Sequence, residues 1–195
     1  WLGVGANGRF AALTNIRDPH QPPGRRSRGE LVAGFLSKNM PIDDYLDDVV
    51  ARSPEYGGFN LLIGNNNELW HFNARESEAV MLPPGVYGLS NAGLDTPWPK
   101  LLKARAALSE VLDDPQPRAL LALLNDSQSA PFAELPDTGV GLATETLLSS
   151  VFIASQSYGT RASTALIVQA DGTRHLVERS FGPYGGHLGE VEILV

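Results

Sequence analysis

The sequence opens with WLGVGANGRFAALTN, residues 1–15, and this stretch decides the fold class that we expect. Two apolar runs flank the pair Asn7–Gly8. An Asn-Gly pair is typical of the type I′ hairpin turn, because both of its central positions adopt positive φ angles and its twist matches that of paired strands. The opening therefore predicts an antiparallel hairpin whose first strand already includes Trp1.

The position of Trp1 is an unusual one for the first residue of a chain. The predicted strand begins at the first residue, and the sequence has no initial methionine. Both features indicate that the sequence starts in the middle of a fold. We therefore expect that amino-terminal strands of the domain lie upstream of Trp1.

The composition is that of an ordinary globular protein. Hydrophobic residues make up 43% and charged residues 19% of the 195 residues, which excludes a disordered or collagen-like chain. Domains usually have about 100–200 residues, so we expect one domain over residues 1–195. No apolar run approaches the roughly 18 residues that a membrane-spanning helix needs. With no secretion signal in view, we expect a soluble, cytoplasmic protein without a membrane span.

Charge and cysteine content narrow the function classes. The net charge of -7 argues against nucleic-acid binding, since phosphate recognition needs a basic face. The sequence has no cysteine, so these residues offer no disulfide, thiolate metal site or cysteine nucleophile. The four histidines show no i,i+4 pair, and we expect no metal site. They are His20, His71, His175 and His187.

Hydrophobic periodicity predicts both helices and strands. Ser27 and Glu30 have capping-box spacing before a helix, and a second helix is expected from Pro41. Further helices are expected over residues 99–112 and 117–124. Strands are expected over residues 59–63, 68–72, 79–82, 86–89, 147–153, 165–170, 175–181 and 191–195, with a hairpin turn at Asp171–Gly172. These elements indicate an α+β fold with mostly antiparallel sheets covered by helices.

The first group of candidate site residues follows the second strand of the opening hairpin. Asn15 can donate a hydrogen bond to a developing oxyanion, Arg17 can clamp a carboxylate, and Asp18 can orient either of them. The alternative is an Asx turn with an Arg–Asp pair on the surface, since Asn and Asp favour turns for local reasons. The arginines at positions 25, 26 and 28 suit either an anionic ligand or a solvated loop.

Two further candidates come later in the chain. Asn91 follows a predicted strand and is therefore a second polar residue at the end of a strand. The aromatic residue Trp98 comes shortly afterwards and could contact a ligand there. The alternative is a strand-to-helix connection in which Asp95 or Thr96 caps the next helix. Arg161 precedes another predicted strand, where it either meets an anion or forms a structural ion pair.

Several blocks of the sequence together resemble the NRDE domain family, which is also called the transport-and-Golgi-organisation protein 2 family. The blocks span nearly the whole chain in the family's order. They are WLGV at 1–4, GRFAALTN at 8–15, RDP at 17–19, SRGELV at 27–32, GFNLL at 58–62, YGLSNA at 87–92, DTPWPK at 95–100, LPDTG at 135–139 and YGTR at 158–161.

The resemblance implies a fold and a missing segment. Family members begin with Met-Cys and carry an Asn-Arg-Asp-Glu motif soon afterwards, and we expect both to lie upstream of Trp1. The implied fold is the four-layer αββα sandwich of the N-terminal nucleophile hydrolases, here without its amino-terminal strands.

The resemblance also implies a chemistry. In similar amidases a terminal cysteine attacks a carbon–nitrogen bond, its own amine is the base, and asparagines stabilise the oxyanion. Asn15 and Asn91 match the asparagine positions, and we expect substrate contacts from Arg17, Asp18, Trp98 and Arg161. An amide hydrolase or acyl transferase for a small-molecule substrate, with no required cofactor, is therefore one expectation. On that expectation the present chain is inactive by itself.

Other family members imply a different expectation, a non-catalytic protein that handles haem or lipid or acts in trafficking. Haem would then be the ligand, with His20 or His71 as the residue that coordinates iron. A lone histidine is more often structural or exposed. A third expectation is an interaction scaffold whose pocket has degenerated.

Overall fold

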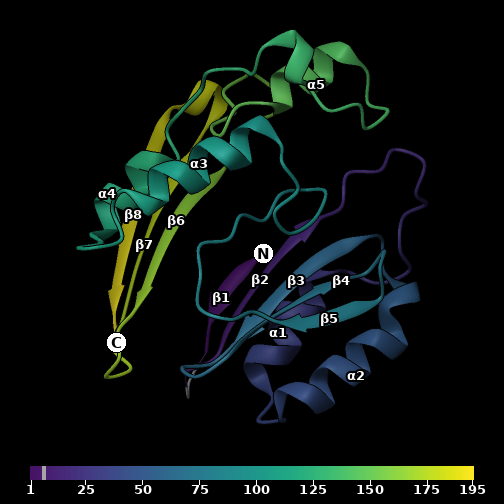
Figure 1. Cartoon of the computed structure of the whole chain (residues 1–195), viewed down its shortest axis with the longest axis vertical. Helices are drawn as coiled ribbons and strands as arrows, with labels where there is room; N and C mark the ends of the chain where they lie inside the picture. Colours follow the sequence, from purple (N-terminus) through teal and green to yellow (C-terminus); the bar gives the residue numbers. More distant parts are fainter. Residues whose placement is uncertain (6–7) are drawn as a thin grey trace. The chain divides into compact units, whose positions relative to one another are not determined.

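The computed structural model describes residues 1–5 and 8–195. The chain divides into two compact units, Trp1–Thr96 and Pro97–Val195. Each unit has its own antiparallel sheet and its own helices (Figure 1). The α+β class and the antiparallel sheets that the sequence predicts are therefore confirmed, whereas the four-layer αββα sandwich and the single domain over residues 1–195 stay predictions.

The first unit contains a five-stranded sheet in the order β1-β2-β3-β4-β5. Its strands are β1 Leu2–Val4, β2 Phe10–Asn15, β3 Phe59–Gly64, β4 Leu69–Asn73 and β5 Glu78–Met81. The opening hairpin is confirmed, because Leu2 pairs with Ala12 in an antiparallel register. The ladder extends one residue beyond β1, where the backbone of Trp1 exchanges hydrogen bonds with that of Leu13. The turn predicted at Asn7–Gly8 lies partly outside the described residues.

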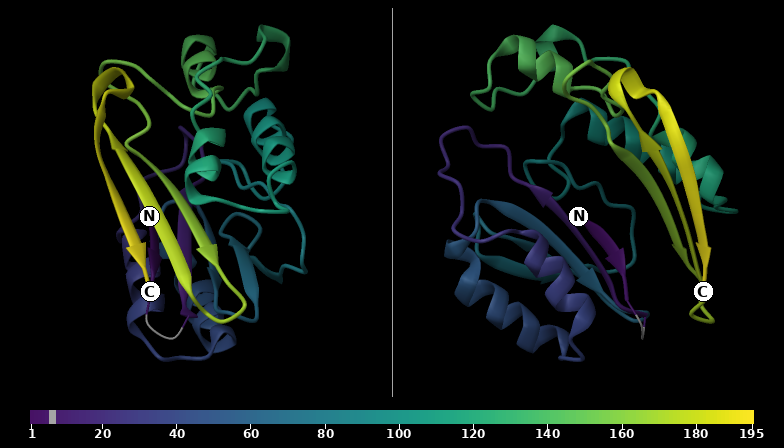
Figure 2. Two further views of the ribbon diagram at one scale, coloured as in Figure 1. Left: turned by 90° about the vertical axis from the view of Figure 1, so that its left-hand side faces the viewer. Right: turned by 180° about the vertical axis from the view of Figure 1, so that it is seen from behind.

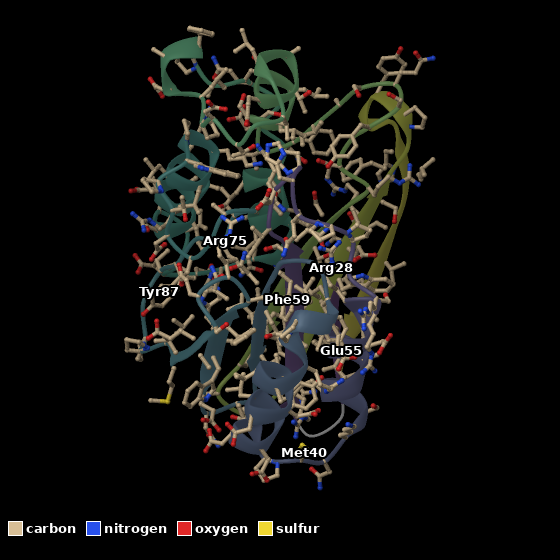
Figure 3. The ribbon with its side chains drawn as sticks, turned by 90° about the vertical axis from the view of Figure 1, so that its right-hand side faces the viewer. Arg28, Met40, Glu55, Phe59, Arg75 and Tyr87 are labelled. Atoms are coloured by element: carbon tan, nitrogen blue, oxygen red, sulfur yellow. The ribbon has the colours of Figure 1, made fainter. Side chains whose placement is uncertain are left out.

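One face of this sheet packs against two helices and forms the core of the unit. The helices are α1 Gly29–Ser37 and α2 Ile42–Arg52, and both lie on the same side of the sheet (Figures 1 and 2). Leu61 and Phe72 alternate inward from the sheet and contribute to the core with Phe35 and Val49 of the helices. All four are fully buried. Phe59, labelled in Figure 3, belongs to the same core.

The prediction of a capping box at Ser27 is wrong, although the helix predicted after it is confirmed. The N-cap residue of α1 is Arg28, and no side-chain hydrogen bond caps the helix. Ser27 instead accepts the Glu30 N–H through its main-chain carbonyl oxygen. The side chain of Glu30 accepts hydrogen bonds from Arg26 and does not complete a box.

The other face of the first sheet carries polar side chains at one end. Thr14, Asn60 and Asn73 lie side by side on three neighbouring strands. The segment that follows β5 lies against this end, since the main-chain carbonyl of Ser90 accepts a hydrogen bond from the Thr14 hydroxyl. The strand predicted over residues 86–89 is wrong: only an isolated bridge joins Leu89 to Leu94.

The physical reason is that this segment folds back on itself. The Asp95 N–H bonds to the Gly88 carbonyl oxygen, and the Gly88 N–H bonds to the Asp95 carboxylate. These local bonds occupy backbone groups that a strand ladder would need.

The second unit contains a three-stranded sheet in the order β6-β7-β8. Its elements are α3 Pro99–Ser109, α4 Pro117–Leu123, α5 Leu142–Leu148, β6 Ala162–Val168, β7 Arg174–Phe181 and β8 His187–Leu194. The predicted β6–β7 hairpin is confirmed, with Gly172 at a φ of 88°. Leu121 of α4 packs on Ala165 and Val177 and so covers one face of this sheet.

The strand predicted over residues 147–153 is wrong, because helix α5 includes its first two residues. The helix then ends in a local bond, in which the Ser149 hydroxyl donates to the Thr146 carbonyl oxygen at 2.7 Å. The Phe152 N–H bonds to the Asp126 carbonyl oxygen rather than to a strand. Within the described ranges, no helix is long and apolar enough to cross a bilayer.

The core of the first unit gives a stability prediction. Replacing the fully buried Leu61 by Ala should lower the free energy of unfolding by about 2–5 kcal/mol, because it removes buried methyl groups and leaves a cavity. Urea denaturation followed by circular dichroism measures the loss. Val80→Ala is the matched control, since Val80 is 42% exposed on the edge strand β5 and should cost less than about 1 kcal/mol. Equal losses for the two variants would contradict this position of the core.

Candidate functional site

A pocket of about 520 Å³ lies at the carboxyl end of β2, in the first unit. Its wall includes Asn15, Asp18, Gln21, Arg26 and Arg28. Most of these residues come from the loop between β2 and α1, where prolines and a glycine prevent regular structure. The wall is therefore rich in amide, carboxylate and guanidinium groups.

Specific contacts hold the loop in place. The Gly58 N–H donates to the Gln21 side-chain oxygen at 2.8 Å, and Arg28 donates to the Gly58 carbonyl oxygen at 3.0 Å. Gly24 lies so close to the chain at Gly57 that a Cβ at position 24 would approach the Gly57 nitrogen to 2.2 Å. Only a glycine fits position 24 without moving the backbone.

Some charged side chains of the pocket wall pair with an opposite charge in the described part of the chain, and others do not. Arg26 contacts the carboxylates of Glu30 at 2.5 Å and Glu55 at 3.3 Å, and these hydrogen bonds raise the pKa of Arg26 above its ordinary value. Asp18 pairs with Arg75 at 2.9 Å; Arg28, Glu55 and Arg75 are labelled in Figure 3. Among the described residues, Arg28 has no carboxylate partner, so it supplies positive charge that a ligand can use.

The two asparagines that the sequence singles out are brought together. The Asn91 side-chain amide donates to the Asn15 main-chain carbonyl oxygen at 2.8 Å, and the Arg17 N–H donates to the Asn91 carbonyl oxygen at 2.7 Å. One of the two N–H groups of the Asn91 amide is therefore in use. The Asn15 side chain lies in the pocket wall and makes no hydrogen bond to another described residue. Asn15 is thus the better placed of the two to donate to a ligand.

A buried polar cluster lies beneath the Asn91 segment. Asn60 is fully buried, and its side-chain nitrogen lies 3.4 Å from the Thr14 hydroxyl, 3.5 Å from the Ser90 carbonyl and 3.4 Å from the Ala92 carbonyl. His71 Nε2 lies 3.2 Å from the Asn60 side-chain oxygen. The His71 pKa is lowered because burial disfavours the charged imidazole. A neutral imidazole that donates from Nε2 satisfies the Asn60 oxygen and fixes the orientation of its amide.

The other candidate residues, Asp18, Trp98 and Arg161, differ in their contacts and in the unit to which they belong. The Asx turn offered as an alternative at Asp18 is present, because its carboxylate accepts the His20 N–H at 3.0 Å. Asp18 also forms a surface ion pair with Arg75. Trp98 and Arg161 both belong to the second unit: Trp98 is buried at the N-cap of α3, and Arg161 is exposed just before β6.

The predicted capping role of Asp95 or Thr96 at the next helix is not found. No side chain caps the start of α3, so neither Asp95 nor Thr96 has the capping role that the sequence allowed. Asp95 instead accepts the Gly88 N–H. In the described ranges, no group of three His, Cys, Asp or Glu side chains could hold a metal ion. The substrate-binding roles of Arg17, Asp18, Trp98 and Arg161 stay predictions.

Sequence reasoning missed Asn60, Gln21 and Gly24. Asn60 interrupts the apolar stretch of β3, and a polar residue inside a buried strand is a signal for a buried hydrogen-bonding role. Gln21 and Gly24 carry no such signal, because a loop rich in proline and glycine gives no indication of which groups its backbone approaches.

Two antiparallel sheets, each with its own helices, define the class: an α+β protein. The family described as Transport and Golgi organisation 2 matches residues 1–183. The chain belongs to this family, which is the NRDE domain family that its sequence blocks resemble.

Curated relatives agree with this assignment. The chain is 39% identical over 200 residues to the Transport and Golgi organization protein 2 homolog of Bos taurus. It is 36% identical over 196 residues to the homolog of Homo sapiens. Each comparison covers 92% of this chain and 71% of the relative.

The buried imidazole predicts a pH dependence of stability. The folded-state pKa of His71 lies below its ordinary value of 6.5, so the unfolded chain binds the proton more readily. The contribution of His71 to stability should be complete above about pH 6.5 and should be lost as the pH falls through the lowered pKa. Urea denaturation between pH 7.5 and pH 5 measures it. In His71→Gln, which keeps an amide donor for Asn60, stability should fall less over this range, and an unchanged fall would contradict the prediction.

The Asn60 cluster predicts a local effect on the Asn91 segment. Asn60→Ala removes the buried donor that faces the Ser90 and Ala92 carbonyls, and leaving such groups unpaired costs about 1–3 kcal/mol. Hydrogen exchange measured by mass spectrometry should become faster in residues 88–93. Asn67→Ala in the exposed β3–β4 turn is the control and should leave exchange there unchanged. Unchanged exchange in the Asn60 variant would show that the cluster does not hold this segment.

Proposed function

We propose that the pocket at the end of β2 binds a polar small molecule with a carbonyl group, whose oxygen accepts a hydrogen bond from the Asn15 side chain. The observation that carries the proposal is the Asn15 amide, which lies in the wall of a polar pocket and is not used by another described residue. A donor that is already in place and needs no rearrangement is what stabilises developing negative charge on a carbonyl oxygen.

The charges of the wall support an amide or acyl substrate with an anionic or strongly polar end. Arg28 keeps guanidinium N–H groups besides the one that bonds to the Gly58 carbonyl. Arg26, in contrast, is compensated by two carboxylates. A substrate that places its carbonyl at Asn15 and its acidic end toward Arg28 would use both groups of the same wall.

The chemistry that we propose is hydrolysis of a carbon–nitrogen bond, or acyl transfer, of the N-terminal nucleophile hydrolase-like type. Its nucleophile would be a terminal cysteine, and no cysteine occurs within these 195 residues. The present residues would then supply the carbonyl-binding and substrate-binding part of the site. The second asparagine, Asn91, would act mainly by holding the Asn15 backbone, since one of its N–H groups is bound there.

A haem-handling or lipid-handling role is the alternative proposal, and a role in trafficking belongs with it. The printed names of the relatives refer to transport and Golgi organization, a description of those proteins. His71 is poorly suited to coordinate iron, because it is buried and its Nε2 contacts Asn60. His20 is exposed and would be the histidine to test first.

The test uses the longest form of the protein that its gene encodes and a β-lactone probe that acylates nucleophiles. Mass spectrometry should find an acyl adduct at an amino-terminal cysteine, and Asn15→Ala should slow its formation roughly 10²- to 10³-fold, as expected for an oxyanion donor. Asn67→Ala in the exposed β3–β4 turn should leave the rate unchanged.

Two results would overturn the catalytic proposal. One is the absence of an adduct in protein that circular dichroism shows to be folded. The other is an undiminished rate in Asn15→Ala. A haem-induced Soret shift that His20→Ala abolishes, together with a higher melting temperature in haem, would favour the alternative.

A further inference from the structure

The second unit contains a pocket whose lining residues all belong to that unit. Its volume is about 760 Å³, which is within the range of about 300–1,000 Å³ that is typical of small-molecule sites. It lies at the end of the sheet where β7 turns into β8, and this turn is at the top of Figure 1 in yellow. The segment after α4 closes one side through Asn125 and Ser127.

Aromatic rings form the floor of this pocket. The rings of Phe152 and Phe181 meet edge to face, with centroids 4.8 Å apart, and both are at least nine-tenths buried. The His187 ring lies 6.5 Å from Phe181, also in an edge-on arrangement. Tyr184 contributes to the wall although it is 68% exposed, so its ring is available to a ligand. Such rings favour the face or edge of another aromatic ring.

The backbone of the turn is shaped to bring these rings together. The register between β7 and β8 shifts at Ser180/Phe181, which leaves Leu188 unpaired and sets His187 opposite Phe181. Bulges of this kind redirect side chains and are common beside binding sites. Gly185 has a φ of 73°, and a Cβ at this position would come within 2.7 Å of the Phe152 ring.

Tyr184 itself has a positive φ of 54°, which is unusual for a residue other than glycine. Its N–H bonds to the Ser155 carbonyl oxygen at 2.9 Å, and this contact holds the turn in its strained conformation. A strained, bulky residue at the rim of a pocket points to a role in binding, because strain of this kind is kept where function requires a particular geometry.

The charges at the rim restrict the chemistry of the ligand. Arg179 donates two hydrogen bonds to Glu190, at 3.1 and 2.7 Å, and Arg118 pairs with the same carboxylate at 3.1 Å. The charge of Glu190 is thus compensated by two guanidinium groups, so neither an anionic nor a cationic ligand would meet an uncompensated opposite charge in this ion-pair group. The rim therefore favours an uncharged ligand, whose polar groups can bond to Asn125 and Ser127.

We infer that this pocket is a second binding site, which takes an uncharged, flat heteroaromatic molecule against Tyr184 and the Phe152–Phe181 floor. The site does not depend on the function proposed for the first unit, since it is built entirely from residues of the second.

The test uses the whole 195-residue chain and indole-3-carboxamide as the probe. In ¹H–¹⁵N spectra the probe should shift the signals of residues 152–155 and 181–187, the two segments that carry the aromatic rings of the pocket. Cyclohexanecarboxamide, which has the same amide on a saturated ring, and the anion indole-3-carboxylate should each bind about tenfold more weakly or not at all.

Tyr184→Ala should weaken binding of indole-3-carboxamide about tenfold, the loss expected when one aromatic contact is removed. Because Tyr184 is largely exposed, its removal leaves no core cavity. Phe132→Ala is the matched control: Phe132 is 72% exposed in the same unit but is not part of this pocket, and its removal should leave binding unchanged. Binding that is absent up to millimolar probe, equal for the saturated probe, or equal in Tyr184→Ala would overturn the inference.

Discussion

The arrangement of the first unit depends on one buried amide. Asn60 is fully buried in the central strand of the sheet, and a buried amide must find hydrogen-bond partners or destabilise the fold. It finds them in Thr14, in His71 and in the carbonyls of the segment after β5. That segment carries Asn91, which bonds to the backbone of Asn15 at the pocket. The need to satisfy one buried polar side chain thus connects the sheet to the candidate site.

The two pockets differ in the way their walls are stabilised. The pocket at β2 is held by hydrogen bonds between the side chains of Gln21 and Arg28 and the backbone of Gly58, and Arg28 gives it charge that no carboxylate among the described residues compensates. The pocket beside β8 has a floor of packed aromatic rings and a rim whose arginines are paired with Glu190. This difference is why we propose a polar, charged molecule for the first pocket and a flat, uncharged one for the second.

Hydrophobic pattern predicted most of the elements and failed where local polar bonds decided the backbone. The helices of the first unit and the strands β3 and β7 follow from the pattern of apolar residues. The strand expected over residues 191–195 covers only the second half of β8. Residues 86–89 and 147–153 have the composition of strands, yet the Asp95 carboxylate and the Ser149 hydroxyl bond to nearby backbone groups. Such competition depends on where a side chain points, which periodicity does not report.

The sequence by itself determined the antiparallel hairpins, the α+β class and the family, because these depend on local turn chemistry, on alternation and on ordered blocks of residues. It also identified Asn15 and Asn91 as site candidates. Only the tertiary structure decided that the Asn91 side chain donates a hydrogen bond to the Asn15 backbone and that Asp18 pairs with Arg75. It also decided that aromatic residues far apart in the chain line one pocket. The reason is that hydrogen bonds and ring contacts between distant residues depend on distances that exist only once the chain has folded.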